Sequence, residues 1–251
     1  MQHPFFCSLK SLLLTALSCC FLLGNAQTTN TNDNRQRVKL ETNMGDIVIA
    51  LYNETPRHRD NFIKLAKEGF YDSLLFHRVI EDFMIQGGDP DSRHALPGAS
   101  LGEGGPGYDL PAEIHFPQLF HKRGAVAAAR EGDDVNPERK SSGSQFYIVW
   151  GKMCSHAMVN RARLNIKKIT DGQATISEAM EEVYALQGGT PHLDAGYTVF
   201  GEVVEGLETT VYAIQTATTD DNNRPFDDIR ILKATVLEPE IKVSATEEIT
   251  Q

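Results

Sequence analysis

Apolar residues recur in short runs from position 38 onward, and most of these runs have the alternation or the short length that is typical of β-strands. The first two runs, 38–42 and 46–51, are separated by the turn sequence Asn-Met-Gly at 43–45, and this arrangement predicts an antiparallel hairpin. Further β-type runs follow at 75–80, 83–86, 124–129, 145–149, 198–203 and 229–236. The pattern therefore predicts a domain built mainly of short strands.

Helical spacing of apolar residues occurs in few places. One helix is predicted between Pro56 and Gly69, because Phe62 and Leu65 share a face and the flanking residues are typical helix ends. A second helix is predicted at 207–216. Many short strands joined by Gly-rich turns, with two helices, favour an antiparallel barrel or sandwich over a parallel α/β sheet.

The stretch 151–190 departs from this pattern of short strands. Segments 161–169 and 176–186 both have helical periodicity, and Thr175 or Ser177 is a suitable capping residue for the second. We therefore expect a helical insertion between two strands. Its role stays open at this point, because such an insertion can contact a partner or client protein or simply pack on the strands.

Residues 1–26 are interpreted as a signal peptide. Lys10 precedes the apolar stretch 12–23, and small residues lie at the positions that a signal peptidase inspects, which predicts cleavage after Ala26 and export. A membrane anchor is less favoured, since about a dozen apolar residues fall short of the roughly 20 that span a bilayer. A lipoprotein anchor through Cys19 or Cys20 is a minor alternative.

The rest of the chain divides into three parts. Residues 27–36 are polar and are predicted to form a flexible leader, 37–238 one domain, and 239–251 a disordered acidic tail. Signal removal would leave Cys154 as the one remaining cysteine, so no internal disulfide is expected and the thiol is interpreted as inert.

The charge and the apolar runs narrow the class of partner. The formal net charge is −10, which disfavours binding to nucleic acid or to anionic lipid. No apolar run after the signal segment is long enough to span a membrane. The His and Cys residues show no spacing typical of metal ligands, so we expect no metal.

Arg78 is the most informative single residue, because it lies inside the apolar run 75–80. Burying an unpaired charge costs several kcal/mol, so such an arginine needs a partner or a purpose. A structural ion pair with a nearby Asp is the ordinary explanation, and a role in chemistry is the other. Its neighbour His77 would point to the opposite face of a strand and is expected to be structural.

The segments around Arg78 resemble the motifs of a known family. Residues 76–78 (Phe-His-Arg) and 83–89 (Phe-Met-Ile-Gln-Gly-Gly-Asp) look like the signature of cyclophilins, and 142–148 and 193–203 are similar to that family's second and third motifs. The motifs lie in the family's order, and the likeness extends over about 38–238 apart from the insertion. It implies a closed eight-stranded antiparallel β-barrel capped by two helices, with peptidyl-prolyl cis/trans isomerase activity.

The resemblance also implies roles for individual residues. Arg78 corresponds to the catalytic arginine, and Gln86 to a polar groove residue that assists it. Seven residues correspond to the walls that bind proline and the adjoining backbone: Phe83, Met84, Ala129, Gln145, Tyr147, Leu193 and Tyr197. The substrates would be proline-containing polypeptides, and because no bond is made or broken the activity needs no cofactor.

The chain departs from the family's usual pattern at three positions. His192 stands where a pocket tryptophan is typical, which puts tight binding of cyclosporin-like peptides in doubt. Tyr197 replaces a pocket histidine, as in bacterial-type members, and together with the signal peptide this indicates a protein of the periplasm, which we expect to be a monomer. Tyr147 adds a hydroxyl where phenylalanine is usual, and the orientation of that hydroxyl is left open.

Two other classes of function compete with an isomerase that assists folding of exported proteins. The first is a module of the same fold that binds proline-containing segments or acts as a holdase without catalysis. Arg78 favours the enzyme, because binding alone does not need a charged donor. The second is a hydrolase built on Ser142 or Ser144, but the sequence there lacks the form of a nucleophile elbow.

Overall fold

The computed structural model describes residues 34–238. The predicted signal peptide, most of the predicted leader and the predicted tail lie outside these residues, so those boundaries stay predictions. Within the described part the chain is mainly β. None of the helices between residues 34 and 238 combines the length and apolarity that crossing a membrane requires.

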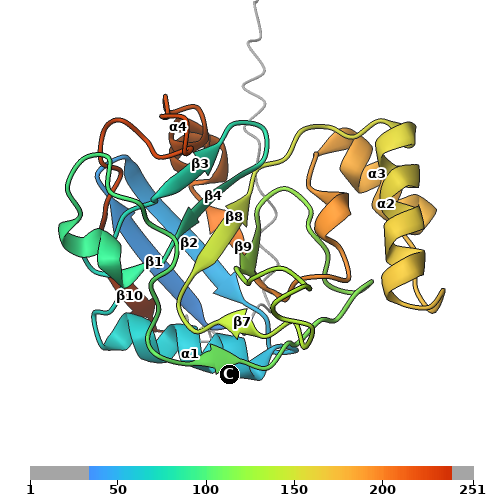
Figure 1. The fold of residues 1–251 in the computed structure, drawn as a ribbon, viewed down its shortest axis with the longest axis horizontal. Helices are drawn as coiled ribbons and strands as arrows, with labels where there is room; N and C mark the ends of the chain where they lie inside the picture. The colour runs from blue at the N-terminus through green and yellow to red at the C-terminus, as the bar shows by residue number, and fades with distance from the viewer. Residues whose placement is uncertain (1–33, 239–251) are drawn as a thin grey trace, which may run out of the picture. The chain divides into compact units, whose positions relative to one another are not determined.

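Eight strands form one antiparallel sheet in the order β10-β1-β2-β9-β6-β8-β4-β3 (Figure 1). Their bounds are β1 Arg37–Thr42, β2 Gly45–Leu51, β3 Arg78–Ile80, β4 Met84–Gly87, β6 Ala125–Ala128, β8 Phe146–Val149, β9 Val199–Glu205 and β10 Ile231–Leu237. The predicted hairpin is present, since β1 pairs with β2 and Thr42 lies opposite Gly45. Two short strands, β5 (Asp109–Leu110) and β7 (Ser141–Ser142), pair separately.

The eight-stranded antiparallel sheet confirms the predicted strand count and direction, whereas its closure into a barrel stays a prediction. Strands β3 and β10 end the sheet without pairing to each other. The N–H of Val79, in the middle of the three-residue β3, instead donates to the carbonyl of Asn223, in the loop that precedes β10, at 2.8 Å. The segment that leads into β3 does meet the start of β10, because Ser73 N–H donates to the Ile231 carbonyl at 2.7 Å and Ile231 N–H donates to the Leu74 carbonyl at 2.8 Å.

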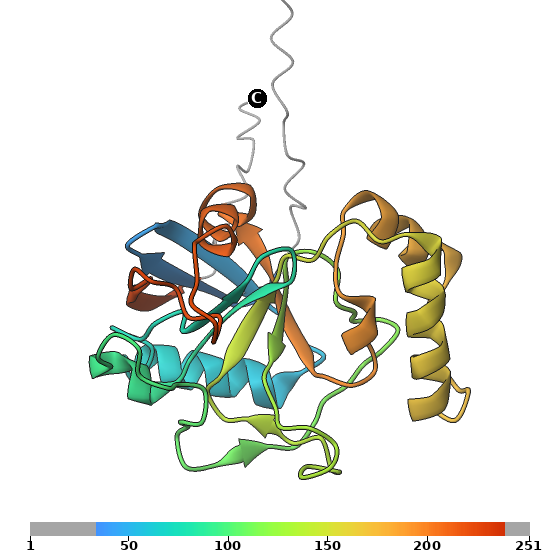
Figure 2. The ribbon, with the colours of Figure 1, turned by 45° about the horizontal axis from the view of Figure 1, so that its top comes forward.

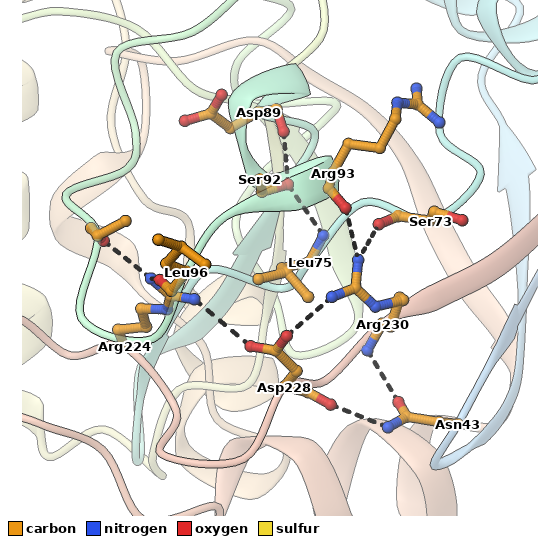
Figure 3. Close-up of polar contacts among 11 residues, drawn as sticks. Asn43, Ser73, Leu75, Asp89, Ser92, Arg93, Leu96, Arg224, Asp228 and Arg230 are labelled. Carbon is orange, nitrogen blue, oxygen red and sulfur yellow. Dashed lines mark hydrogen bonds and ion pairs between the residues drawn. The ribbon is translucent and has the colours of Figure 1, made fainter.

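Arg230 connects the segments that flank this opening (Figure 3). Its guanidinium donates to the carbonyls of Ser73 and Arg93 and forms an ion pair with Asp228 at 2.8 Å. Its own N–H donates to the side chain of Asn43, in the first hairpin, at 2.8 Å. Through its side chain and its backbone N–H, this one residue therefore connects three segments that are distant in sequence.

Two helical segments lie at opposite ends of the sheet (Figures 1 and 2). Helix α1 (Pro56–Lys67) starts with proline in its first turn and buries Phe62 and Leu65 against the core. The helix expected at 207–216 is divided into a π-helical turn, η3 (Leu207–Val211), and the short α4 (Tyr212–Gln215). Two 3₁₀ turns complete the inventory, η1 (Pro90–His94) and η2 (Pro191–Leu193).

Helices α2 (His156–Ile169) and α3 (Glu178–Leu186) lie within 151–190 and stand to one side of the sheet (right in Figures 1 and 2). Each begins with a serine cap, because Ser155 accepts from the N–H of Met158 and Ser177 from that of Met180. The helices share an apolar cluster of their own: Cys154, Val159, Ala162, Ile166, Ile176, Met180, Tyr184 and Ala195.

The chain enters and leaves the insertion at one point. Gly189 forms isolated bridges with both Lys152 and Lys122. Gly151 has a φ of +60°, and a Cβ there would lie 2.4 Å from the backbone of Gly189. Glycine is therefore required at this neck, where two backbones come too close for a side chain.

Replacing Arg230 with alanine would leave the carbonyls of Ser73 and Arg93 without this donor and would remove one of the two arginine partners of Asp228. We expect the free energy of unfolding to fall by about 2 kcal/mol, measured by urea denaturation. Lys233→Ala, an exposed change on the adjoining strand, is the control and should alter stability by less than about 0.5 kcal/mol. Equal losses in both variants would contradict the role given to Arg230.

Candidate active site

Alternation along the strands separates two apolar faces. Ile85 and Ile148 point into the main core, whereas Met84 and Tyr147, each one residue away, belong to a second cluster on the other face. This pocket-face cluster consists of Met84, Ala125, Ala127, Tyr147, Val149 and Val199, with Tyr52, Ile80, Phe83, Leu119, Ala129, Leu193 and Tyr197 packed against it. Burial on both faces explains why these strands are apolar throughout.

The pocket-face cluster contains all six apolar residues that the sequence predicted for substrate binding: Phe83, Met84, Ala129, Tyr147, Leu193 and Tyr197. Met84 and Tyr147 are buried, and the other four are only partly covered. Phe146 packs in the main core, as expected. The fold thus brings together residues drawn from three separate motifs, although their roles toward a substrate remain predictions.

The three predicted polar residues form a chain of hydrogen bonds. Arg78 lies opposite Gln86 in the β3–β4 pair, and its Nη1 donates to Gln86 Oε1 at 3.1 Å. Gln86 Nε2 donates to Gln145 Oε1 at 3.0 Å. Gln145 Nε2 in turn donates to the carbonyls of Gly102 and Gly104 at 2.7 and 2.8 Å. The guanidinium is therefore oriented by two amides that are anchored on a loop.

The structural ion pair considered for Arg78 is not present within residues 34–238. Its guanidinium is half-buried, and its described side-chain bond goes to a neutral amide. A guanidinium carries five N–H donors. Arg78 therefore has donors left over in a partly covered position, which is the condition for binding a further acceptor.

A polar hollow of about 660 Å³ lies beside this chain. Gln86, Ala129 and Gln145 line it together with the loop that contains Gly102 and Gly104. Arg78 is not among its lining residues and is connected to it through Gln86. The polar and apolar parts of the predicted site thus lie next to each other along β4 and β8.

A buried chain of hydrogen bonds that sequence reasoning missed lies behind the cluster. The Tyr147 hydroxyl lies 3.0 Å from His121 Nε2, and His121 Nδ1 lies 2.9 Å from Asp194 Oδ1. The Tyr184 hydroxyl donates to Asp194 Oδ2 at 2.6 Å. All four residues are buried, and burial raises the pKa of Tyr147 well above its ordinary value.

This series of hydrogen bonds determines the orientation of the Tyr147 hydroxyl, which the sequence left open. With the Nδ1–H of His121 donating to Asp194, the Nε2 atom of the same ring accepts from the hydroxyl of Tyr147. The hydroxyl is therefore engaged away from the substrate face. Asp194 lies within the third motif, but no local pattern marks His121 or Tyr184, because the contact exists only after folding.

The described domain matches the family model for "Cyclophilin type peptidyl-prolyl cis-trans isomerase/CLD" over residues 37–236. The chain belongs to the cyclophilin family. A relative from Staphylococcus haemolyticus, named as a peptidyl-prolyl cis-trans isomerase, is 37% identical over 201 residues, which are 79% of this chain and 90% of the relative. The family and the isomerase class predicted from the motifs are thereby confirmed.

Solved structures place the fold in the same family. A crystal structure of a cyclophilin type isomerase from Cryptosporidium parvum matches with a TM-score of 0.57 at 25% identity, covering 81% of this chain and 98% of that one. A second structure of that protein, obtained in the presence of the dipeptide Ala-Pro, matches with a TM-score of 0.56 at 24% identity and covers 81% of this chain and 99% of that one.

The two residues that depart from the usual cyclophilin pocket are held by local contacts. His192 stacks on Phe83 with ring centroids 5.5 Å apart. Tyr197 lies under the guanidinium of Arg130, 4.4 Å from ring centroid to Cζ, and Arg130 also donates to the Gly196 carbonyl. Both replacements therefore keep an aromatic wall.

His77 is buried, in agreement with its expected structural place. Neither ring nitrogen has a hydrogen-bond partner within the described chain. Burial lowers the pKa of His77 from 6.5 to about 4, so the folded protein holds this ring uncharged at neutral pH.

His77 should therefore make this cyclophilin sensitive to acid. Below pH 6.5 the unfolded chain binds a proton at this residue, while the folded protein does so only near the pKa of about 4, so stability is lost as pH falls between these values. Between pH 7 and 4.5 we expect the free energy of unfolding to fall by about 2 kcal/mol more in wild type than in His77→Gln. Parallel curves from urea denaturation at several pH values would refute this.

Proposed function

We propose that this cyclophilin accelerates the cis/trans isomerisation of X-Pro bonds in exported polypeptides, with Arg78 as the residue that stabilises the twisted amide. The observation that carries the proposal is the position of Arg78: a half-buried guanidinium without a described ion pair, oriented by Gln86 at the edge of the pocket-face cluster. A permanently charged donor in this position has no evident structural task.

The chemistry of the prolyl bond explains why such a donor accelerates rotation. Amide resonance imposes a barrier of about 18 to 20 kcal/mol, so uncatalysed exchange takes tens to hundreds of seconds. In the half-rotated state the resonance is lost, and the prolyl nitrogen regains a lone pair that can accept a hydrogen bond. Arg78 can donate to that lone pair but not to the planar amide nitrogen, so it lowers the barrier selectively.

The remaining residues would hold one side of the bond still while the other turns. Phe83, Met84 and Tyr147 offer the apolar contact that a pyrrolidine ring needs, and the hydroxyl of Tyr147 is already engaged with His121. Gln86 and Gln145 offer amides to the adjoining backbone. The related Cryptosporidium protein was crystallised in the presence of Ala-Pro, which supports proline-containing peptides as the class of ligand.

Arg78→Ala should lower kcat/KM for a short X-Pro peptide by about 100-fold, as when one preorganised donor to a transition state is removed. Arg78→Lys should recover only part of the rate, since an ammonium lacks the planar fork of a guanidinium. The rate is measured by exchange NMR of a tetrapeptide, without a coupled protease.

The control for this prediction is Arg57→Ala, an exposed arginine in α1 outside the candidate site, which should keep the wild-type rate. Binding of the same peptide to Arg78→Ala should persist within a few fold, because the planar ground state gains little from the guanidinium. Equal rates in wild type and Arg78→Ala would favour the alternative of a proline-binding module without catalysis.

Export to the periplasm is the second part of the proposal, and its support is the sequence of residues 1–26 alone. When the full chain is produced in a Gram-negative host, we expect the periplasmic fraction to contain a protein that starts at Gln27 by intact-mass analysis. Ala26→Leu should impair this cleavage and retain the precursor. A full-length chain confined to the cytoplasm would contradict export, and a lipid-modified mass in the membrane fraction would favour the lipoprotein alternative.

A further inference from the structure

A groove of about 800 Å³ separates the insertion from the sheet. One wall is a face of α2, and the opposite wall is the turn between β3 and β4 with the segment around η2. We call it the insertion groove; its lining is Glu81, Asp82, Phe83, Lys152, Ala157, Met158, Arg161, Ala162, Asn165, Gly189, Thr190, Pro191 and His192. The volume is in the range of sites that bind ligands.

The centre of the insertion groove is apolar and its edges carry mixed charge. The stacked rings of Phe83 and His192 lie near Pro191 and face the helix, from which Met158 projects with 41% of its surface exposed. Acidic side chains lie at the β3–β4 turn and basic ones at Lys152 and in α2, so neither sign of ligand charge is favoured. The apolar centre therefore determines which side chains the groove can bind.

The insertion groove adjoins the candidate active site at Phe83, which lines the groove and also packs on the pocket-face cluster. Gln86, three residues further along, lines the polar hollow. Three residues of a strand span about 10 Å. A proline at Met84 would therefore have the polar hollow on one side and the insertion groove on the other.

We propose that the insertion groove binds a large apolar side chain of the client polypeptide, two to four residues from the proline that is isomerised. This inference rests on the proposed function and extends it to the choice of client. An extended polypeptide bound at the candidate active site continues on both sides of the proline. The part of the chain that passes Phe83 enters the insertion groove.

An unsatisfied polar group on the same wall supports a polypeptide as the occupant. Thr190 is 2% exposed and lines the insertion groove, and its Oγ1 has no hydrogen-bond partner within residues 34–238. Buried hydroxyls in folded proteins are rarely left unpaired. A backbone carbonyl of a bound chain is the kind of acceptor that this hydroxyl lacks, whereas a purely aliphatic ligand would offer none.

The experiment compares three peptides built on one Ala-Pro core, with the full chain as enzyme. The first has alanine at all flanking positions, the second has leucine at positions two to four before the proline, and the third has leucine at the equivalent positions after it. We expect kcat/KM to rise by about five- to tenfold for one extended peptide, mainly through KM, because part of a large side chain leaves water.

Two tryptophan substitutions on α2 test whether the gain arises in the insertion groove. Ala157→Trp fills the groove, and the ratio of kcat/KM between the favoured leucine peptide and the alanine peptide should fall to about one. Leu164→Trp is the matched control, because Leu164 is 72% exposed on the same helix and does not line the groove, and the ratio should stay at the wild-type value.

The outcomes separate this inference from the proposed function. If neither leucine peptide is favoured, or if the gain survives Ala157→Trp, the insertion groove does not bind the client and the inference fails while the isomerase stands. If the alanine peptide is not isomerised at all, the proposed function fails. In that case the affinities of the peptides, measured by fluorescence anisotropy with the same two variants, still test whether the groove binds an apolar side chain.

Discussion

The candidate site depends on the alternation of side chains along three neighbouring strands. Ile85 and Phe146 turn toward the main core, so Met84 and Tyr147, their neighbours in sequence, must turn to the opposite face. A slip of one residue in either strand would exchange the two sets, placing Met84 and Tyr147 in the main core and the core side chains on the pocket face. The apolar interior therefore does more than stabilise the domain, because it also determines which residues a substrate can reach.

Two hydrogen-bond chains then limit how the residues on this face can move. The first orients Arg78 through Gln86 and Gln145, which restricts the positions that the guanidinium can take. The second runs from Tyr147 to Tyr184 in α3, and it connects the back of the cluster to the insertion. The insertion is thus part of the support of the pocket as well as a wall of the neighbouring groove.

Local patterns in the sequence were sufficient for the hairpin, for α1 and for the apolar residues that meet at the cluster, since period, turn residues and motifs are all short-range signals. The contacts at the edge of the sheet could not be predicted in this way, because the Val79 N–H donates to Asn223, which lies 144 residues further along the chain. The contact between His121 and Asp194 is equally remote. This contact determines the direction in which the hydroxyl of Tyr147 points, and no sequence pattern around His121 or Asp194 reveals it.

The neck at Gly151 and Gly189 has an evolutionary consequence. Since the chain returns to the point where it departed, the excursion between these residues can be lengthened, shortened or exchanged without shifting β8 or β9, and a longer loop costs little additional entropy. Selection can therefore alter the insertion outside the Tyr184 contact while the pocket keeps its support. New preferences among clients can arise there at little risk to the strands that carry the arginine.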